Sequence, residues 1–329
     1  MAKKTNERRA ITTWPLYLML AVVFVLYIVY QQAYALSFVL GAMLFIIIAI
    51  LVVIETVNSV RDKEYKRDIL ELIMAVVAIL LLWFALKFFL HTSYPLDVVP
   101  SCSMLPVLQR GDMIALQGIS NISMLKAPVI DVSAGAYQDM LNSTENEQLL
   151  CLAYKTANGT TAVSQFMQPG YSVGLYRSNQ SGSGVISPDA QTGLITYTCG
   201  VREVKFDNGT IENEVYTSAI TVAGTTIIGD NNNTIIVYQT VPQDYFYRMG
   251  DVYIVHRVYA VIDAAGKYYA LTKGDNNPGL DIQYDNYPAN ESDIQGRVIA
   301  SIPYLGYLKL IISSQFSEPA GCNSYPIGG

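Results

Sequence analysis

The sequence has little charge, and the charge that it carries shows no basic excess. Asp, Glu, Lys and Arg make up 15% of the 329 residues, whereas about a quarter is usual in a soluble globular domain. The formal net charge is −6 at pH 7, which argues against a general nucleic-acid partner. The shortage of charge lies mainly in the N-terminal part of the chain.

Three apolar runs in this part predict transmembrane helices over about residues 14–30, 36–54 and 70–90. Each is near the length of about 20 residues that a bilayer-spanning helix needs. Three such runs so close together favour membrane spans over buried core helices. Basic residues before the first run also fit a cleavable signal peptide, but its length and the apolar segment that follows favour a retained anchor.

The basic residues of the short loops predict how the spans are oriented. The N-terminus and the loop between the second and third spans are basic, whereas residues 31–35 carry no charge. Because Lys and Arg favour the cytoplasmic side, the N-terminus and second loop are predicted to be cytoplasmic and everything after residue 90 extracytoplasmic. The basic residues of the second loop are Arg61, Lys63, Lys66 and Arg67.

All sequons and all cysteines fall in the predicted outer part. N-glycosylation and disulfides both belong to that side of a membrane. Four cysteines allow three pairings, and Cys151 with Cys199 is preferred because both lie in one region. The other two cysteines are Cys102 and Cys322. The N-x-S/T sequons begin at Asn121, Asn142, Asn158, Asn179, Asn208, Asn232 and Asn290.

The outer part is predicted to be a largely antiparallel β domain. Short β-rich runs such as "NTIIVYQTV" and "DVYIVHRVYAVID" are separated by Gly, Asp and Asn, which is typical of strands joined by turns. Residues 91–117 and 246–314 are predicted to form the main β domain. Residues 118–245, which hold six of the seven sequons, are predicted to form a glycosylatable β-rich insertion, and residues 315–329 a tail.

The sequence has only two histidines, which limits the choice of an imidazole base. His91 lies at the end of the third span, and His256 lies in the middle of the strand "GDVYIVHRVYAV". A histidine in a strand is more often structural than catalytic. However, serine and aspartate side chains that could act with it are present, and serine, histidine and carboxylate are the groups of an acyl-transfer enzyme. These candidates are Ser101, Ser103, Asp275 and Asp281.

Four segments in order resemble the conserved boxes of type I signal peptidases. "PSCSMLPVLQRGD" is similar to the serine box, and "GDVYIVHRV" to the box in which the archaeal and endoplasmic-reticulum branch has histidine where most bacterial members have lysine. "LTKGDNNPGLD" resembles the acidic box of that branch, and "GRVIASIPYLG" the closing strand. The resemblance does not extend to most of the insertion or to the first two spans.

The resemblance implies a role for each candidate residue. Ser103 would be the nucleophile, His256 the general base, Asp281 the carboxylate that orients His256, and Asp275 a supporting carboxylate. Ser101 and the backbone N–H of Ser103 would stabilise the oxyanion of the tetrahedral intermediate. The alternative for Ser101 is a turn hydroxyl that bonds its own backbone. No metal or organic cofactor is implied.

The implied function is that of a membrane-bound serine endopeptidase, which removes N-terminal signal peptides from exported preproteins at the extracytoplasmic membrane face. Its implied partners are these signal peptides, the lipid bilayer and the protein-export channel. One alternative is a dedicated peptidase for a narrow set of surface, pilus or S-layer proteins. Another is a non-catalytic glycosylated surface protein on a membrane stalk. Because the insertion holds none of the implied catalytic groups, trimming it is expected to spare the chemistry.

The chain departs from the family pattern at Cys102, where a small residue such as glycine is usual. Cys102 is either a tolerated small side chain or a thiol or disulfide close to the nucleophile. The long insertion and the two additional spans are further departures, but none of them removes an implied catalytic group.

Overall fold

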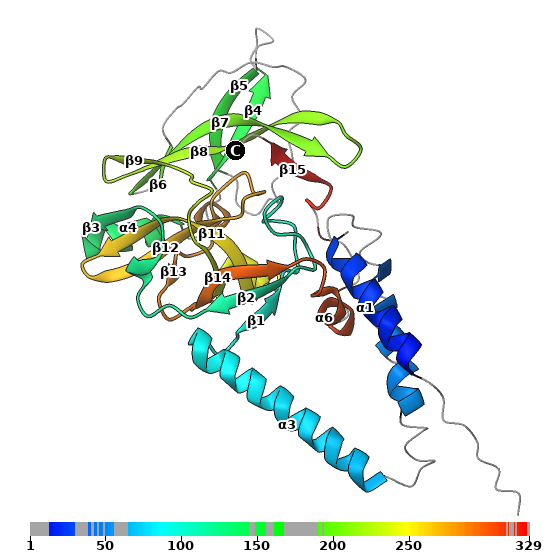
Figure 1. The fold of residues 1–329 in the computed structure, drawn as a ribbon. Coiled ribbons are helices and arrows are strands. Elements are labelled where there is room, and N and C mark those ends of the chain that lie inside the picture. The colour runs from blue at the N-terminus through cyan, green and yellow to red at the C-terminus, as the bar shows by residue number, and fades with distance from the viewer. Residues whose placement is uncertain are drawn as a thin grey trace, which may run out of the picture. The chain divides into compact units, whose positions relative to one another are not determined.

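The computed structural model divides the chain into two compact units. One comprises Met1–Phe89 and Pro303–Leu305, and the other comprises Leu90–Ile302 and Gly306–Gly329. Figure 1 shows the helices of the first unit and the sheets of the second. The residues that the structure describes are 13–29, 39–40, 43–44, 46–48, 50–55, 65–144, 149–155, 161–167, 190–192, 194–313, 315, 319 and 321–327.

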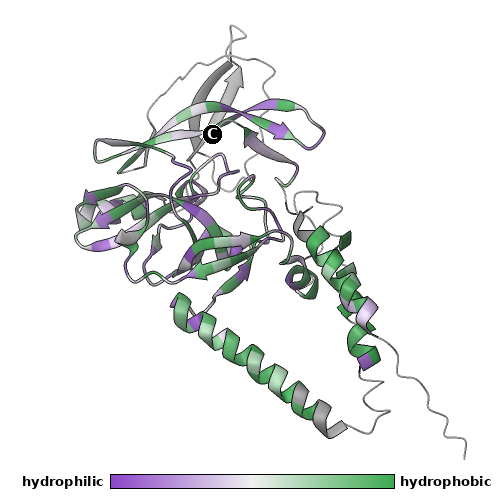
Figure 2. Ribbon diagram, viewed as in Figure 1, coloured by the Kyte–Doolittle hydropathy of each residue, from purple (hydrophilic) through white to green (hydrophobic). Residues whose placement is uncertain are grey.

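The first unit contains the apolar helices α1 (Trp14–Val29) and α3 (Tyr65–Leu90). Among the described residues, only the segment Leu72–Leu90 of α3 is both long and apolar enough to cross a membrane. Most of its apolar side chains are exposed, and Figure 2 shows hydrophobic residues along most of its length. The predicted span over 36–54 lies partly outside the described residues. The first two spans therefore stay predictions.

The second unit is built around a mainly antiparallel sheet of eight strands (Figure 1). The strand order is β1-β2-β14-β10-β11-β12-β13, and β3 pairs with β11 in parallel. The expectation of a mainly β protein with antiparallel sheets is confirmed. The strands are β1 (Leu96–Val98), β2 (Met113–Gln117), β3 (Val129–Val132), β10 (Ile235–Gln239), β11 (Tyr253–Ala264), β12 (Lys267–Lys273), β13 (Ala289–Asn290) and β14 (Ile294–Ile302).

A second sheet, of order β15-β7-β8-β9 with β6 on β7, and a separate hairpin of β4 and β5 complete the strands that the structure describes. The disulfide Cys151–Cys199 joins β4 to β7, as the sequence favoured. These strands are β4 (Leu149–Lys155), β5 (Thr161–Met167), β6 (Ala190–Thr192), β7 (Ile195–Phe206), β8 (Ile211–Val222), β9 (Thr225–Ile228) and β15 (Ser324–Ile327).

Short helices connect the strands of the second unit. α4, the longest of them, follows β3 within the region that the sequence predicts to be β-rich. α6 coincides with the apolar run "YLKLII" and spans only six residues. The helices are η1 (Ile122–Met124), α4 (Ala134–Thr144), α5 (Tyr245–Arg248), η2 (Asp281–Tyr284) and α6 (Tyr307–Ile312).

The main sheet takes strands from both sides of the predicted insertion boundaries. β3 and β10 lie within residues 118–245, yet both pair with β11. β10 occupies the middle of the sheet between β14 and β11, and its Ile236, Val237 and Tyr238 are buried. This short apolar run has polar, sequon-rich flanks, so the sequence alone does not indicate that it forms a central strand. The predicted tail likewise contributes β15, which pairs with β7.

Burial along β11 explains how this strand places charged groups in the interior. All residues from Val255 to Ile262 are buried, because other elements pack on both faces of the strand. Successive side chains of a strand point to opposite faces. His256 and Arg257 therefore project to opposite sides of the sheet, and each requires polar partners there.

Candidate active site

The nucleophile candidate Ser103 lies in the loop that connects β1 to β2. The loop is closed by two backbone hydrogen bonds, from Val99 N–H to Asp112 O (3.0 Å) and from Gly111 N–H to Val99 O (2.9 Å). Met104, next to Ser103, is fully buried with Val99 in the apolar cluster under the loop. Gly111 has φ +87°, a conformation that favours glycine. The Gly-Asp pair that ends the serine box thus closes the loop.

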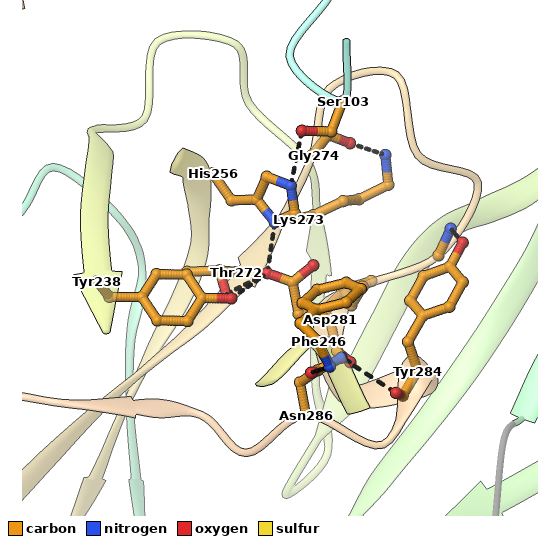
Figure 3. A network of polar contacts seen from close by, with 12 residues as sticks. Ser103, Tyr238, Phe246, His256, Thr272, Lys273, Gly274, Asp281, Tyr284 and Asn286 are labelled. Atoms are coloured by element: carbon orange, nitrogen blue, oxygen red, sulfur yellow. Dashed lines mark hydrogen bonds and ion pairs between the residues drawn. The ribbon is translucent and has the colours of Figure 1, made fainter. Parts of the chain in front are cut away.

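The structure brings three predicted residues into a chain of hydrogen bonds. The Nε2 atom of His256, on β11, lies 3.0 Å from Oγ of Ser103. Its Nδ1 atom lies 2.7 Å from Oδ2 of Asp281 at the start of η2, as Figure 3 shows. With Nδ1–H donating to the carboxylate, Nε2 presents its lone pair to the serine hydroxyl. This is the nucleophile–base–orienter arrangement of an activated serine.

The carboxylate of Asp281 is buried, with 1% of the residue exposed. Its Oδ2 atom accepts hydrogen bonds from Thr272 Oγ1 (2.6 Å) and Tyr238 Oη (2.9 Å) as well as from His256. Burial by itself would raise the pKa of Asp281, but the electrostatic interaction with His256 and these hydrogen bonds outweigh it and lower the pKa below its usual value. The carboxylate is therefore kept ionised beside the imidazole.

The surroundings of the pair contain residues that the sequence analysis missed. Thr272 lies on β12 within the acidic box "LTKGDNNPGLD", and Tyr238 comes from β10, within the predicted insertion. The rings of Phe246 and His256 form a T-shaped pair, with ring centroids 6.1 Å apart and ring planes at 79°. Asn286 donates to Asp281 O (3.1 Å) and accepts from Phe246 N–H (2.9 Å). Of these four residues, only Thr272 lies within one of the four motifs, so it is the only one that the sequence could have indicated.

Asp275, the predicted supporting carboxylate, makes its side-chain contacts with Arg257. Oδ1 accepts from Arg257 Nε (2.8 Å) and Oδ2 accepts from a terminal nitrogen of the same guanidinium (2.7 Å). Arg257 also donates to the carbonyl oxygens of Asn231 and Asn233. Asp275 thus neutralises the charge of Arg257, which follows His256 on β11 and projects to the opposite face of the sheet. Asp275 can therefore support His256 only indirectly, through Arg257.

Ser101 lies beside the nucleophile candidate. Its Oγ atom is 3.2 Å from Oγ of Ser103, and both residues are half-buried. A hydroxyl at this distance is placed close to the position where negative charge develops when Ser103 attacks a carbonyl. The geometry is compatible with the implied oxyanion role, which stays a prediction.

Lys273 is a titratable group next to this site to which the sequence analysis assigned no role. Its ammonium donates to the carbonyl oxygen of Gly274 at 3.1 Å (Figure 3). Burial lowers the pKa of Lys273 to about 7, and the nearby positive charge of Arg202 adds to the effect. The carboxylates of Asp275 and Glu214 oppose the shift but are too weak to cancel it.

The lowered pKa of Lys273 predicts a pH dependence of stability. Between about 7 and the ordinary value of 10.5, the unfolded chain binds a proton that the native chain has released. The contribution of this group to the free energy of unfolding therefore rises with pH through this window. We expect the unfolding temperature of the wild type to rise relative to that of Lys273→Met between pH 7 and pH 9, measured by circular dichroism. Parallel pH profiles of the two proteins would contradict the assignment.

Comparison with known proteins finds several curated relatives of one kind. A segment of 66 residues is 39% identical to the signal peptidase complex catalytic subunit of Pyricularia oryzae, covering 19% of this chain and 38% of that protein. The chain resembles type I signal peptidases. A segment of 69 residues is 45% identical to the corresponding subunit of Lachancea thermotolerans, covering 19% of this chain and 41% of that protein. No protein-family model matches the chain.

One further match is longer. The corresponding subunit of Colletotrichum graminicola is 28% identical over 160 residues, which is 48% of this chain and 84% of that protein. The chain therefore spans about two-fifths of the length of the first two relatives and most of the third. The resemblance to signal peptidases of the endoplasmic-reticulum branch is confirmed, and the roles of the individual residues stay predictions.

Proposed function

We propose that this protein is a membrane-bound serine endopeptidase that cleaves N-terminal signal peptides from exported preproteins. The observation that carries the proposal is the hydrogen-bonded line from Ser103 through His256 to Asp281. The three residues come from segments that resemble three boxes of one peptidase family, and they lie far apart in the sequence. A purely structural domain has no need to bring them together. This weighs against a non-catalytic surface protein.

The chemistry follows from the geometry. His256 Nε2 takes the proton of Ser103 Oγ as the oxygen attacks the carbonyl carbon of the scissile bond, and Asp281 stabilises the resulting imidazolium. Ser101 Oγ and the backbone N–H of Ser103 donate to the oxyanion. When the intermediate collapses, His256 gives the proton to the leaving amine and the signal peptide remains as an ester on Ser103. Water, deprotonated by His256, then hydrolyses the ester and restores the serine.

The edge of the main sheet supplies a place for an extended substrate. β1 is the outermost strand on its side of the sheet as described, and it ends at Val98, just before the loop that carries Ser103. An extended peptide can add to such an edge through main-chain hydrogen bonds, while shallow pockets select its side chains. Small side chains at the first and third positions before the cut fit this mode of binding.

The proposed location is the membrane, with three spans, a cytoplasmic N-terminus and an extracytoplasmic β domain. α3 supports one span, and Ser103 follows its end at Leu90 after a short connection. Cleavage sites just outside the bilayer would be within its reach, with the bilayer and the protein-export channel as partners. Labelling of single introduced cysteines with an impermeant reagent tests this orientation, since residues 56–68 should be protected in intact cells and residues 207–210 should react.

The proposal is tested by cleavage of a panel of preproteins with the purified full chain in lipid vesicles. A general signal peptidase should cut most of them once, after small residues, as read by N-terminal sequencing, and Ser103→Ala should cut none.

Cleavage of one or a few surface proteins would instead support a dedicated peptidase. The second sheet, which adds a large surface to the domain that bears Ser103, is the feature that favours this second candidate. Cleavage of none would refute both.

Ser101→Ala tests the oxyanion role. We expect kcat to fall by about 10²-fold, as is typical when one oxyanion donor is removed, with little change in KM or in unfolding temperature. Steady-state cleavage of a preprotein and thermal unfolding measure these quantities. If Ser101 is only a turn hydroxyl, the unfolding temperature should fall and kcat of the folded protein should persist.

A further inference from the structure

The C-terminal segment of the chain is joined covalently to the loop that bears Ser103. Cys102, which immediately precedes Ser103, forms a disulfide with Cys322. Residues Ser324–Ile327 then continue as β15 and pair with β7 of the second sheet. The segment that the sequence predicts to be a tail is therefore fixed between the nucleophile loop and the second sheet.

The side chain of Asn276 connects the same segments by hydrogen bonds. Its Nδ2 atom donates to Cys102 O (3.1 Å), Gly321 O (2.9 Å) and Ser324 O (2.9 Å). Its backbone N–H donates to Ser103 O at 2.7 Å. One residue of the acidic box thus contacts the carbonyl groups on both sides of Ser103 and holds the C-terminal segment against them.

These contacts fix the two peptide planes that flank Ser103. The carbonyl of Cys102 and the N–H of Ser103 belong to one planar trans peptide, in which they point in opposite directions. Holding Cys102 O on Asn276 therefore sets the direction of the Ser103 N–H, which the proposed function uses as an oxyanion donor. Holding Ser103 O on the backbone of Asn276 fixes the next peptide plane.

The loop that carries Asn276 is itself held by the second sheet. Arg202 of β7 donates to Asp275 O and Asn276 O, both at 3.1 Å. Its guanidinium is in turn paired with Glu214 of β8, at 2.6 Å. The loops also approach so closely that a Cβ atom on Gly274 would lie 2.7 Å from Ser103 O. Arg202 therefore holds the loop of Asn276 through two of its carbonyl oxygens.

We propose that Asn276 and the Cys102–Cys322 disulfide form a clamp that positions Ser103 for attack, so that the C-terminal segment of the chain holds the nucleophile in place. The inference rests on the proposed function, because it concerns the same nucleophile. Displacing a reacting group by about 1 Å can cost 10²-fold in rate. The residues around Ser103 belong to no strand or helix themselves, so contacts with neighbouring segments must supply this precision.

The clamp is tested with two variants that disrupt it independently, Asn276→Ala and the double variant Cys102→Ala/Cys322→Ala. Cys151→Ala/Cys199→Ala is the matched control, since it removes the disulfide between β4 and β7, which takes no part in the clamp. We expect kcat to fall by about 10²-fold in Asn276→Ala and about tenfold in the first cysteine variant, as expected for a misplaced reacting group. KM should change little, and the control should keep wild-type kcat.

Stability has to be separated from positioning, because the Cys102–Cys322 disulfide closes a chain separation of 220 residues and the control one of 48. The longer loop is expected to contribute more stability. Cleavage is therefore measured well below all unfolding temperatures. Asn276→Ala keeps both disulfides, so it reports on positioning even if the first cysteine variant does not fold.

A second readout does not depend on any preprotein. The chain has two histidines, so ¹⁵N-histidine labelling with His91→Gln leaves the ring signals of His256 alone. We expect the Nε2 signal of His256 to shift in both clamp variants, because the Ser103 hydroxyl moves away from it, and to stay unchanged in the control. Wild-type kcat together with an unchanged Nε2 signal in folded Asn276→Ala would overturn the clamp. Absence of cleavage by the wild type would refute the proposed function, and the His256 signals would still decide the clamp.

Discussion

Ser103→Ala and His256→Ala are each expected to abolish signal-peptide cleavage, with a loss on the order of 10⁴- to 10⁶-fold in kcat, and the double variant should lose hardly more than either single one. In the proposed mechanism the two groups act as one unit, because the hydroxyl that attacks is the one whose proton Nε2 takes, and the two atoms lie 3.0 Å apart. Removing either leaves the other without a partner for the reaction. Single-turnover cleavage of a preprotein in lipid vesicles measures the loss.

Two control replacements show whether such losses are specific. His91→Ala removes the other histidine of the chain, and Ser133→Ala removes a hydroxyl that accepts a hydrogen bond from Ala136 N–H before α4. Both should keep wild-type kcat, although Ser133→Ala should lower the free energy of unfolding by about 1 kcal/mol because it removes a helix cap. A folded Ser103→Ala protein with wild-type activity would end the serine-peptidase proposal.

Asp281→Asn should reduce kcat by about 10⁴-fold, the loss typical when an amide replaces the carboxylate of such a triad. An amide can donate to Nδ1, which favours the tautomer with the proton on Nε2, and that tautomer cannot accept the serine proton. The amide also removes the charge that stabilises the imidazolium. Cleavage rates measure the first effect, and ¹⁵N shifts of the His256 ring identify the tautomer.

Replacements of residues around Asp281 are expected to cause smaller losses of kcat, with which the loss for Asp281→Asn can be compared. Tyr238→Phe and Thr272→Val each remove one donor to Oδ2, and a hydrogen bond to a charged group contributes about 1.5–3 kcal/mol. Each should therefore reduce kcat much less than Asp281→Asn does. Asp275→Asn should also be milder, because Asp275 contacts Arg257. Equal losses for Asp275→Asn and Asp281→Asn would show that the two carboxylates have been assigned the wrong roles.

The sequence alone was sufficient to predict the local features of this protein. β-rich runs bounded by Gly, Asp and Asn predicted the antiparallel sheet, because strand alternation and turn chemistry are encoded by neighbouring residues. The order of the motifs singled out Ser103, His256 and Asp281, which the structure brings within hydrogen-bond distance. It also gave the resemblance to signal peptidases.

Contacts between distant segments were decided by the tertiary structure. Tyr238 reaches Asp281 because β10 pairs with β11 in the middle of the main sheet, although its polar flanks assign it to the insertion by sequence. Trimming all of residues 118–245 would therefore remove a central strand and a hydrogen-bond donor to the triad. Asp275 and Asp281 lie in one motif, and only the turn between them directs one to Arg257 and the other to His256.

The pairing of Cys102 with Cys322 was equally undetermined by sequence. Four cysteines leave three pairings open, and which of them forms depends on how closely the strands bring the Cβ atoms together. Residue type and spacing carry information over a turn or a strand, so they determined the catalytic candidates and the β class. Strand order and loop packing act across hundreds of residues, and only they determined which groups surround Ser103 and hold it in place.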